Sequence, residues 1–243
     1  MSSTDYATLA YTPDRAQYEA RGKRRQQNEQ LETEVPEGFP TKLTGQLVWS
    51  AESIRDTFNW DYVLTVDDLQ EINNALRHFK ALDLPLGELS PSTFPLPTLH
   101  SLLREISNEV HNGQGFKVVR GIPVDQYSRE ENIIIYCGVS SHVAPLRGRQ
   151  DNKWQGQPAD VLVAHVKDLS RGCDAKDIPG PVVTAEKQVF HTDAGDIIAL
   201  FCLSEGAEGG ESYLASTCHV YNVLAERRPD LIKTLSEPWP FDE

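Results

Sequence analysis

Apolar residues recur at spacings of three and four in two stretches of the first half of the chain, which predicts two amphipathic helices. The first stretch begins at Asp67, and its apolar face consists of Leu69, Ile72, Leu76, Phe79 and Leu82. The second follows a proline-rich turn over 91–97, and its apolar face consists of Leu99, Leu102, Leu103, Ile106 and Val110. Gly113 is expected to end this second helix, because glycine commonly follows a last helical turn.

Three further helices and one short strand are expected from capping and turn residues. Glycines bound the apolar run 115–121, which predicts a strand. Ser128 and Glu131 have the spacing of a capping box, and they precede a helix whose body is 133–139. Near the C-terminus, 218–228 and 229–235 are predicted to be helical, since Pro229 suits a first helical turn.

The second half of the chain changes to short β-type runs separated by glycine, proline and aspartate. These runs cover 161–169, 182–190, 197–203 and 212–215. We expect them to form a mainly antiparallel sheet that contains the core, with helices packed beside it. Residues 1–45 are polar and weakly patterned and are expected to be an N-terminal arm to a single domain over 46–243.

Composition and charge exclude several classes of protein. Apolar residues make up 39% and charged residues 24%, as in ordinary globular chains. The formal net charge of −13 opposes binding to nucleic acids and anionic membranes, and no apolar run approaches the roughly 18 residues of a membrane helix. Four cysteines without a CxxC pair and the lack of a secretory signal favour reduced thiols and a cytoplasmic location. The basic run 21–25 is expected to be a solvated charged helix.

The residues most informative about chemistry are His191 and Asp193. In an extended strand, residues two apart project to the same side, so an imidazole and a carboxylate there can converge on one metal ion. Iron(II) is bound by such a pair when one more histidine completes two histidines and one carboxylate. The alternative is a structural histidine capped by a nearby aspartate. The glycine turn 208–212, which includes Ser212, favours a ligand site.

Three other groups were weighed as site residues. His165 alternates with Val161 and Val163, which favours a core or sheet histidine over a metal ligand. The run 147–150 contains two arginines that could contact an anionic substrate, although a solvated loop is favoured. His219 begins a predicted helix, where a surface or capping role is expected.

The stretch from Gly115 to Trp239 resembles the taurine dioxygenase-like (TauD/TfdA) family of iron(II)/2-oxoglutarate-dependent oxygenases. Within that family it is most similar to the clavaminate synthase-like branch. The resemblance rests on the run 115–122, the motif 191–193, the turn 209–212 and the helical segment that leads to 236–241. It implies an α+β, mainly β chain: a double-stranded β-helix, or jelly roll, with flanking helices.

The resemblance also implies an activity. His191 and Asp193 would be two iron ligands, and Ser212 would match the hydroxyl residue that binds a carboxylate of the cosubstrate 2-oxoglutarate. An ordinary turn hydroxyl is the alternative for Ser212. The family oxidises small organic substrates with O2, by hydroxylation, desaturation or a related oxidation, and forms succinate and CO2.

One departure from the family pattern leaves a second hypothesis open. The family's second iron-binding histidine and its 2-oxoglutarate-binding arginine lie near the C-terminal end of the jelly roll. Between Asp193 and Glu243 the one histidine is His219, which comes too early. The jelly roll is therefore expected to be incomplete at its C-terminus. The alternative function is a truncated, inactive homologue that at most binds a ligand or partner, and the substrate and oligomeric state stay open.

Overall fold

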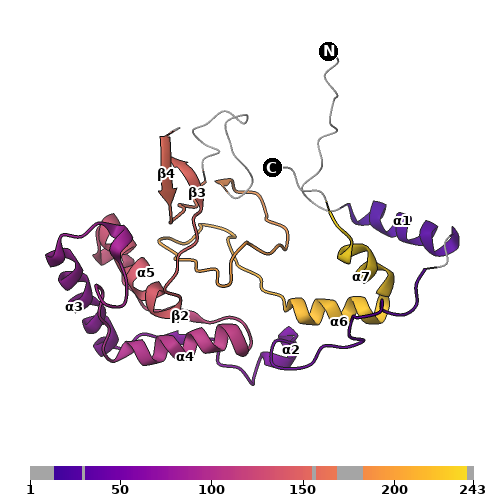
Figure 1. Cartoon of the computed structure of the whole chain (residues 1–243), viewed down its shortest axis with the longest axis horizontal. Helices are drawn as coiled ribbons and strands as arrows, with labels where there is room; N and C mark the ends of the chain where they lie inside the picture. Colours follow the sequence, from indigo (N-terminus) through magenta and orange to yellow (C-terminus); the bar gives the residue numbers. More distant parts are fainter. Residues whose placement is uncertain (1–13, 29–30, 155–156, 169–182, 240–243) are drawn as a thin grey trace, which may run out of the picture. The chain divides into compact units, whose positions relative to one another are not determined.

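The computed structural model describes residues 14–28, 31–154, 157–168 and 183–239 of the chain (Figure 1). Its contacts divide the chain into two compact units. The first unit combines residues 1–31 with 148–195, and the second combines 32–147 with 196–243. No helix in the described part of the chain is long and apolar enough to cross a membrane.

Three helices form the main body of the second unit: α3 (Val66–Leu82), α4 (Leu99–Asn112) and α5 (Arg129–Val143). All three are at the predicted positions. Ser128 and Glu131 form the predicted capping box at the start of α5, and Gly113 follows α4 as expected. Thr65 and Asp68 form an equivalent box at the start of α3. These caps satisfy amide groups that the first helical turn leaves without partners.

The buried core of the second unit lies where these helices pack together. α5 contacts both α3 and α4, as Figure 1 shows. The most deeply buried large side chains are Ile72, Leu89, Phe94, Leu96, Leu99, Leu103 and Ile135. Gly138 of α5 faces Phe94 so closely that a Cβ at this position would lie 2.5–2.7 Å from the atoms of the phenyl ring.

A small parallel sheet lies in the same unit. β2 (Val118–Arg120) falls within the predicted strand and pairs with β1 (Asp61–Val63), in the register Asp61 to Val118. The connection between them contains α3 and α4, as parallel pairing requires a crossover. The strand β1 was not predicted, because three residues are too short for a recognisable alternation. Three one-turn helices complete this part: α2 (Ala51–Ile54), η1 (Leu86–Glu88) and η2 (Val124–Gln126).

The two predicted C-terminal helices are confirmed as α6 (Thr217–Arg227) and α7 (Pro229–Ser236), which pack on each other. Pro229 occupies the first turn of α7, as expected. Residues before α2 run beside α6: Asn222 exchanges two hydrogen bonds with the backbone of Leu43, and the Tyr221 hydroxyl donates to the Pro40 carbonyl at 2.6 Å.

The first unit contains less regular structure. α1 (Arg15–Asn28) includes the basic run 21–25, which confirms the expected exposed charged helix. β3 (Asp151–Trp154) and β4 (Gln157–Val161) form an antiparallel pair. A surface ion pair between Arg149 and Asp160 at 3.2 Å lies beside this pair of strands.

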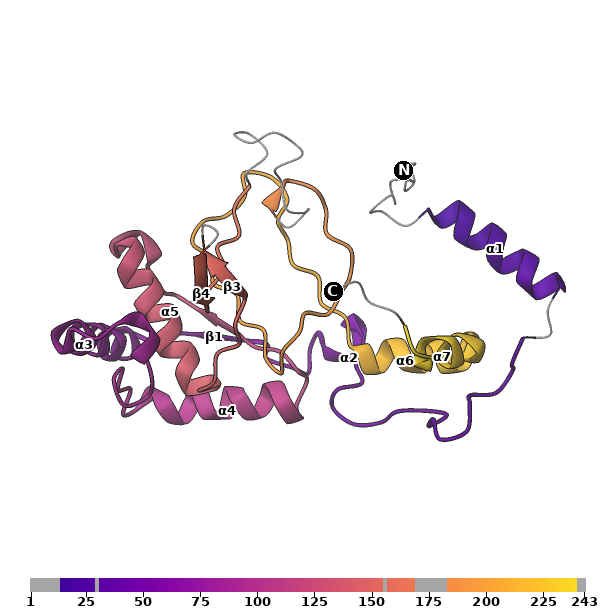
Figure 2. The ribbon, with the colours of Figure 1, turned by 45° about the horizontal axis from the view of Figure 1, so that its top comes forward.

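Most of the sheet predicted for the second half is not formed. Beyond Val161, which ends β4, the described residues of the four β-type runs contain no strand. Figure 2 draws most of this trace as loops. Residues 169 and 182 of those runs, and 240–241 of the C-terminal segment, lie outside the described residues. A strand needs a neighbour to satisfy its backbone groups, and no described segment pairs with these runs.

The prediction that the second half contains the core is therefore wrong. Its apolar side chains are largely exposed, including Leu200 at 81% and Phe190 at 72%, whereas the buried residues lie mainly in the helices of the first half. The flanking helices of the expected architecture are present. The described residues contain two two-stranded sheets, which do not by themselves show the expected jelly roll.

Candidate metal centre

The structure brings His191 and Asp193 together in the first unit. The Nε2 atom of His191 lies 3.7 Å from Oδ1 of Asp193. The segment is irregular rather than the expected strand end, with Gly195 in a positive-φ conformation two residues beyond Asp193. Both side chains are more than half exposed, at 53% and 57%. The pair can therefore be reached by solutes from solvent.

The orientation of the His191 ring is set by its own backbone. Its Nδ1 lies 2.7 Å from the carbonyl oxygen of Val189, a distance at which Nδ1 donates its proton. In the neutral ring Nε2 then has a free lone pair, and it is this atom that faces Asp193. An imidazole whose second nitrogen donates to a carbonyl is the usual arrangement of a metal-ligating histidine.

The donor set fits two positions of a metal site. A distance of 3.7 Å is too long for a hydrogen bond. It is longer than the roughly 3 Å that separates neighbouring corners of an octahedron with bonds of about 2.1 Å, so the two side chains would move closer together to share one metal ion. No third histidine, cysteine, aspartate or glutamate joins the pair in a metal-binding group within the described ranges.

Ser212 lies in the second unit, in an irregular exposed segment. Gly209 and Gly210 before it have φ values of 71° and 84°, in the left-handed region that glycine enters at no steric cost. The predicted glycine bend is thus present. Because Ser212 belongs to a different unit from His191 and Asp193, its role is argued from the sequence pattern alone.

The other candidates have structural or surface positions. His165 is exposed and follows the end of β4, so the prediction of a core or sheet position is wrong, since no described strand covers the residues after Val161. His219 lies in the first turn of α6, as expected, and its amide donates to the Oγ of Ser216. Arg147 uses Nη2 to bind the carbonyl oxygens of Gly87 and Leu89, so backbone groups of its own unit hold this side chain.

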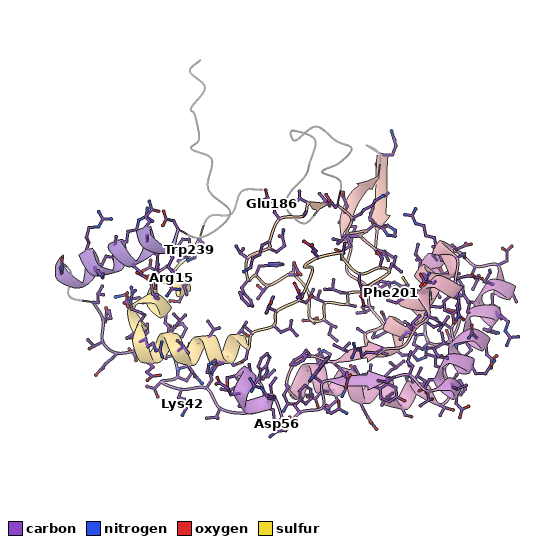
Figure 3. All side chains as sticks on the ribbon, turned by 180° about the vertical axis from the view of Figure 1, so that it is seen from behind. Arg15, Lys42, Asp56, Glu186, Phe201 and Trp239 are labelled. Carbon is purple, nitrogen blue, oxygen red and sulfur yellow. The ribbon has the colours of Figure 1, made fainter. Side chains whose placement is uncertain are left out.

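An anchor that the sequence did not predict holds part of the loop segment. The hydroxyl of Tyr136 on α5 donates to the carbonyl of Ala199 at 2.7 Å. The Tyr136 ring also stacks on Phe201, labelled in Figure 3, with an interplanar angle of 2°. Burial raises the pKa of the Tyr136 hydroxyl. The one signal in the sequence is a tyrosine within the apolar part of the predicted helix. The sequence does not indicate what Tyr136 contacts, because Ala199 and Phe201 lie far along the chain.

A comparison with protein families decides which proteins this chain is related to. The model of the taurine catabolism dioxygenase TauD, TfdA family matches residues 80–243, a range that includes His191, Asp193 and Ser212. The chain belongs to the TauD/TfdA family. The predicted resemblance is confirmed at this level. TauD/TfdA proteins are in general oxygenases that use iron(II), 2-oxoglutarate and O2 on small molecules.

Two curated relatives of the TauD/TfdA chain were found. The taurine hydroxylase-like protein SAT17 of Stachybotrys chartarum is 36% identical over 207 residues, which cover 83% of this chain and 52% of the relative. FR-33289 synthase of Streptomyces rubellomurinus is 28% identical over 191 residues, which cover 78% of this chain and 54% of the relative. The chain thus spans about half the length of the curated relatives it matches.

Proposed function

We propose that this TauD/TfdA chain is an iron(II)/2-oxoglutarate-dependent oxygenase that oxidises a small organic molecule with O2. The observation that supports this proposal best is the geometry of the pair at 191 and 193. Nε2 of His191 faces the Asp193 carboxylate, and the Val189 carbonyl accepts the proton of Nδ1 and so orients the ring. The family match covers this motif.

The roles of the residues follow from their chemistry. His191 Nε2 and a carboxylate oxygen of Asp193 would hold iron(II). The negative charge of Asp193 would offset part of the positive charge of the metal. When bound, iron supplies the reaction of O2 with 2-oxoglutarate, which is coupled to oxidation of the substrate and leaves succinate and CO2. The Val189 carbonyl keeps the imidazole oriented and its Nδ1 protonated. Ser212 would donate its hydroxyl proton to a carboxylate of 2-oxoglutarate.

The reaction type is proposed from the relatives. The Stachybotrys relative is named a taurine hydroxylase-like protein, and its sequence is 36% identical to this chain over the aligned residues. Hydroxylation of a C–H bond is therefore the first outcome to test, with desaturation as the related oxidation. The hypothesis of an inactive homologue gains no support over the oxygenase from these relatives.

Formation of succinate tests the proposal directly. The 243-residue chain is reconstituted anaerobically with iron(II) and 2-oxoglutarate, O2 is admitted, and succinate is measured with and without taurine and other small candidate substrates. We expect succinate to form above the iron-free control. Asp193→Ala should lower the rate by at least about tenfold, because a lost ligand weakens metal binding by at least as much as a lost supporting hydrogen bond.

Asp196→Ala is the matched control. Asp196 is a nearby exposed carboxylate that the proposal gives no role, so this variant should retain the succinate rate. Equal rates for Asp193→Ala and the unaltered chain would contradict the proposal. So would a rate no higher than that of the iron-free control with every substrate tried.

A further inference from the structure

A second candidate site lies among the helices of the second unit. A hollow of about 580 Å³ is lined by one stripe of α3, by the proline-rich segment before α4, and by the facing ends of α4 and α5. This volume is in the range of small-molecule sites, about 300–1,000 Å³. Three prolines, Leu96 and Ala75 give it apolar walls, and its polar lining includes Glu71, His100 and His142.

Two imidazoles at one side of the hollow share a hydrogen bond. His142 is only 2% exposed, and its Nε2 lies 2.8 Å from the carbonyl oxygen of Phe94. Nε2 must therefore donate, which leaves Nδ1 of the neutral ring as an acceptor. Nδ1 of His142 lies 2.9 Å from Nδ1 of His100, so the His100 nitrogen donates. The remaining nitrogen of His100, Nε2, then has a free lone pair.

The buried ring is held in its neutral form. Burial lowers the pKa of His142, and the neighbouring His100 lowers it further, against the opposing effects of the Phe94 carbonyl and Glu71. With His142 neutral, the direction of the shared hydrogen bond is fixed. Nδ1 of His100 then donates the shared hydrogen bond, so in a neutral His100 ring Nε2 is the acceptor, and it has no hydrogen-bond partner among the described residues.

Glu71 supplies the charge of the hollow. Its Oε1 accepts hydrogen bonds from the amides of Thr98 and Leu99, at 2.8 and 3.1 Å, and so caps the start of α4. Within the described ranges Glu71 forms no ion pair, and the other polar lining residues are asparagine and histidine side chains, so Glu71 is the one carboxylate of the lining. Because Glu71 already takes these two helix amides, an anion would find few donors in the hollow.

We propose that this hollow binds a primary ammonium group attached to a small apolar body. The Glu71 carboxylate and His100 Nε2 accept the N–H bonds of the ammonium, and the prolines and Leu96 surround the apolar body. The net charge of −13 favours approach of a cation over that of an anion. This inference does not depend on iron binding at His191 and Asp193.

Benzylammonium is the probe. It is titrated into the metal-free, 15N-labelled 243-residue chain while the imidazole nitrogen resonances of His100 and His142 are followed by NMR. An eight-heavy-atom ligand of ordinary efficiency should give a Kd in the millimolar range. We expect a saturable shift of the His100 Nε2 resonance. Benzyl alcohol, which has the same body without the charge, should bind about fivefold more weakly, and benzoate should bind more weakly still.

Two variants separate the charge of Glu71 from the fold. Glu71→Gln keeps an amide oxygen that can cap α4, and it should lower benzylammonium affinity to that of benzyl alcohol. Glu105→Gln removes an exposed carboxylate on α4 outside the hollow and should leave the affinity unchanged. Circular dichroism confirms that both variants are folded. Absence of a saturable His100 shift, equal affinity for benzoate, or an unchanged affinity in Glu71→Gln would overturn the proposal.

Discussion

Backbone carbonyls set the tautomers of two histidines that have quite different surroundings. His191 donates Nδ1–H to Val189 in an exposed segment, and His142 donates Nε2–H to Phe94 in the core. In each neutral ring the other nitrogen is thereby left as an acceptor, and that of His142 accepts from His100. His191 was predicted as a site residue because its partner Asp193 is two residues away. His142 was not, because its partners come from other elements and only packing brings them together.

The buried position of His142 predicts how stability changes with pH. Burial lowers the pKa of His142, so below the ordinary histidine value of about 6.5 the unfolded chain takes up a proton that the folded chain resists. The free energy of unfolding should therefore fall as the pH is lowered from 7.5 through this value. His100 and Glu71 face the same ring, and Arg104 donates to the His142 carbonyl.

Urea unfolding at a series of pH values tests this expectation. His142→Asn should weaken the dependence between pH 7.5 and 5.5, since the variant lacks the titrating ring. His111→Asn, on α4, is the comparison variant, because it removes a histidine that does not line the hollow beside His142. Parallel curves for the unaltered chain and His142→Asn would contradict the assignment.

The helices were predictable because the signals for a helix lie close together in sequence. Periodic apolar residues, the pair Ser128 and Glu131, and Pro229 each specify local geometry. The β-type runs after Val161 were predicted as strands from composition, but a strand forms only when another segment pairs with it. That requirement is not visible in the run itself, which is why the helices were placed correctly and the sheet was not.

The capping box of α5 should contribute measurably to stability. Ser128 Oγ accepts from the Glu131 amide at 3.2 Å, and the Glu131 carboxylate accepts from the Ser128 amide and from Lys80, contacts that lower the pKa of Glu131 to about 2. Ser128→Ala should lower the free energy of unfolding by about 1 kcal/mol. Ser101→Ala, an exposed serine within α4, is the control. A loss for Ser128→Ala no larger than the control's would show that the cap is unimportant.

The approach of α5 to Phe94 predicts an unusual effect for a helical glycine. An alanine in place of a mid-helix glycine normally stabilises a helix. Gly138→Ala should instead lower the free energy of unfolding by about 1–3 kcal/mol, because its methyl group would overlap the buried phenyl ring. Thermal unfolding measures the change. Gly22→Ala in α1 is the control, because a Cβ there meets nothing within 4 Å, and this variant should not lower the free energy of unfolding. An increase in the free energy of unfolding for Gly138→Ala would contradict the close contact between α5 and Phe94.

Considered as a whole, the chain combines a well-packed helical unit with loops that expose apolar side chains and contain the metal-ligand motif. Family membership rests on residues 80–243, which include both parts. The chain spans about half the length of its curated relatives, so activity of the whole protein is a proposal. The pair at 191 and 193 is the part of that proposal that the structure describes.

Iron binding by this pair is therefore the decisive property. Anaerobic equilibrium dialysis of the 243-residue chain against iron(II) with 2-oxoglutarate measures the stoichiometry and affinity of the metal. We predict one saturable iron per chain, lost in both His191→Ala and Asp193→Ala and retained in His165→Ala, which removes an exposed histidine of the same unit. No bound iron in the unaltered chain, or unchanged binding in either ligand variant, would contradict the assignment of His191 and Asp193 as the metal centre.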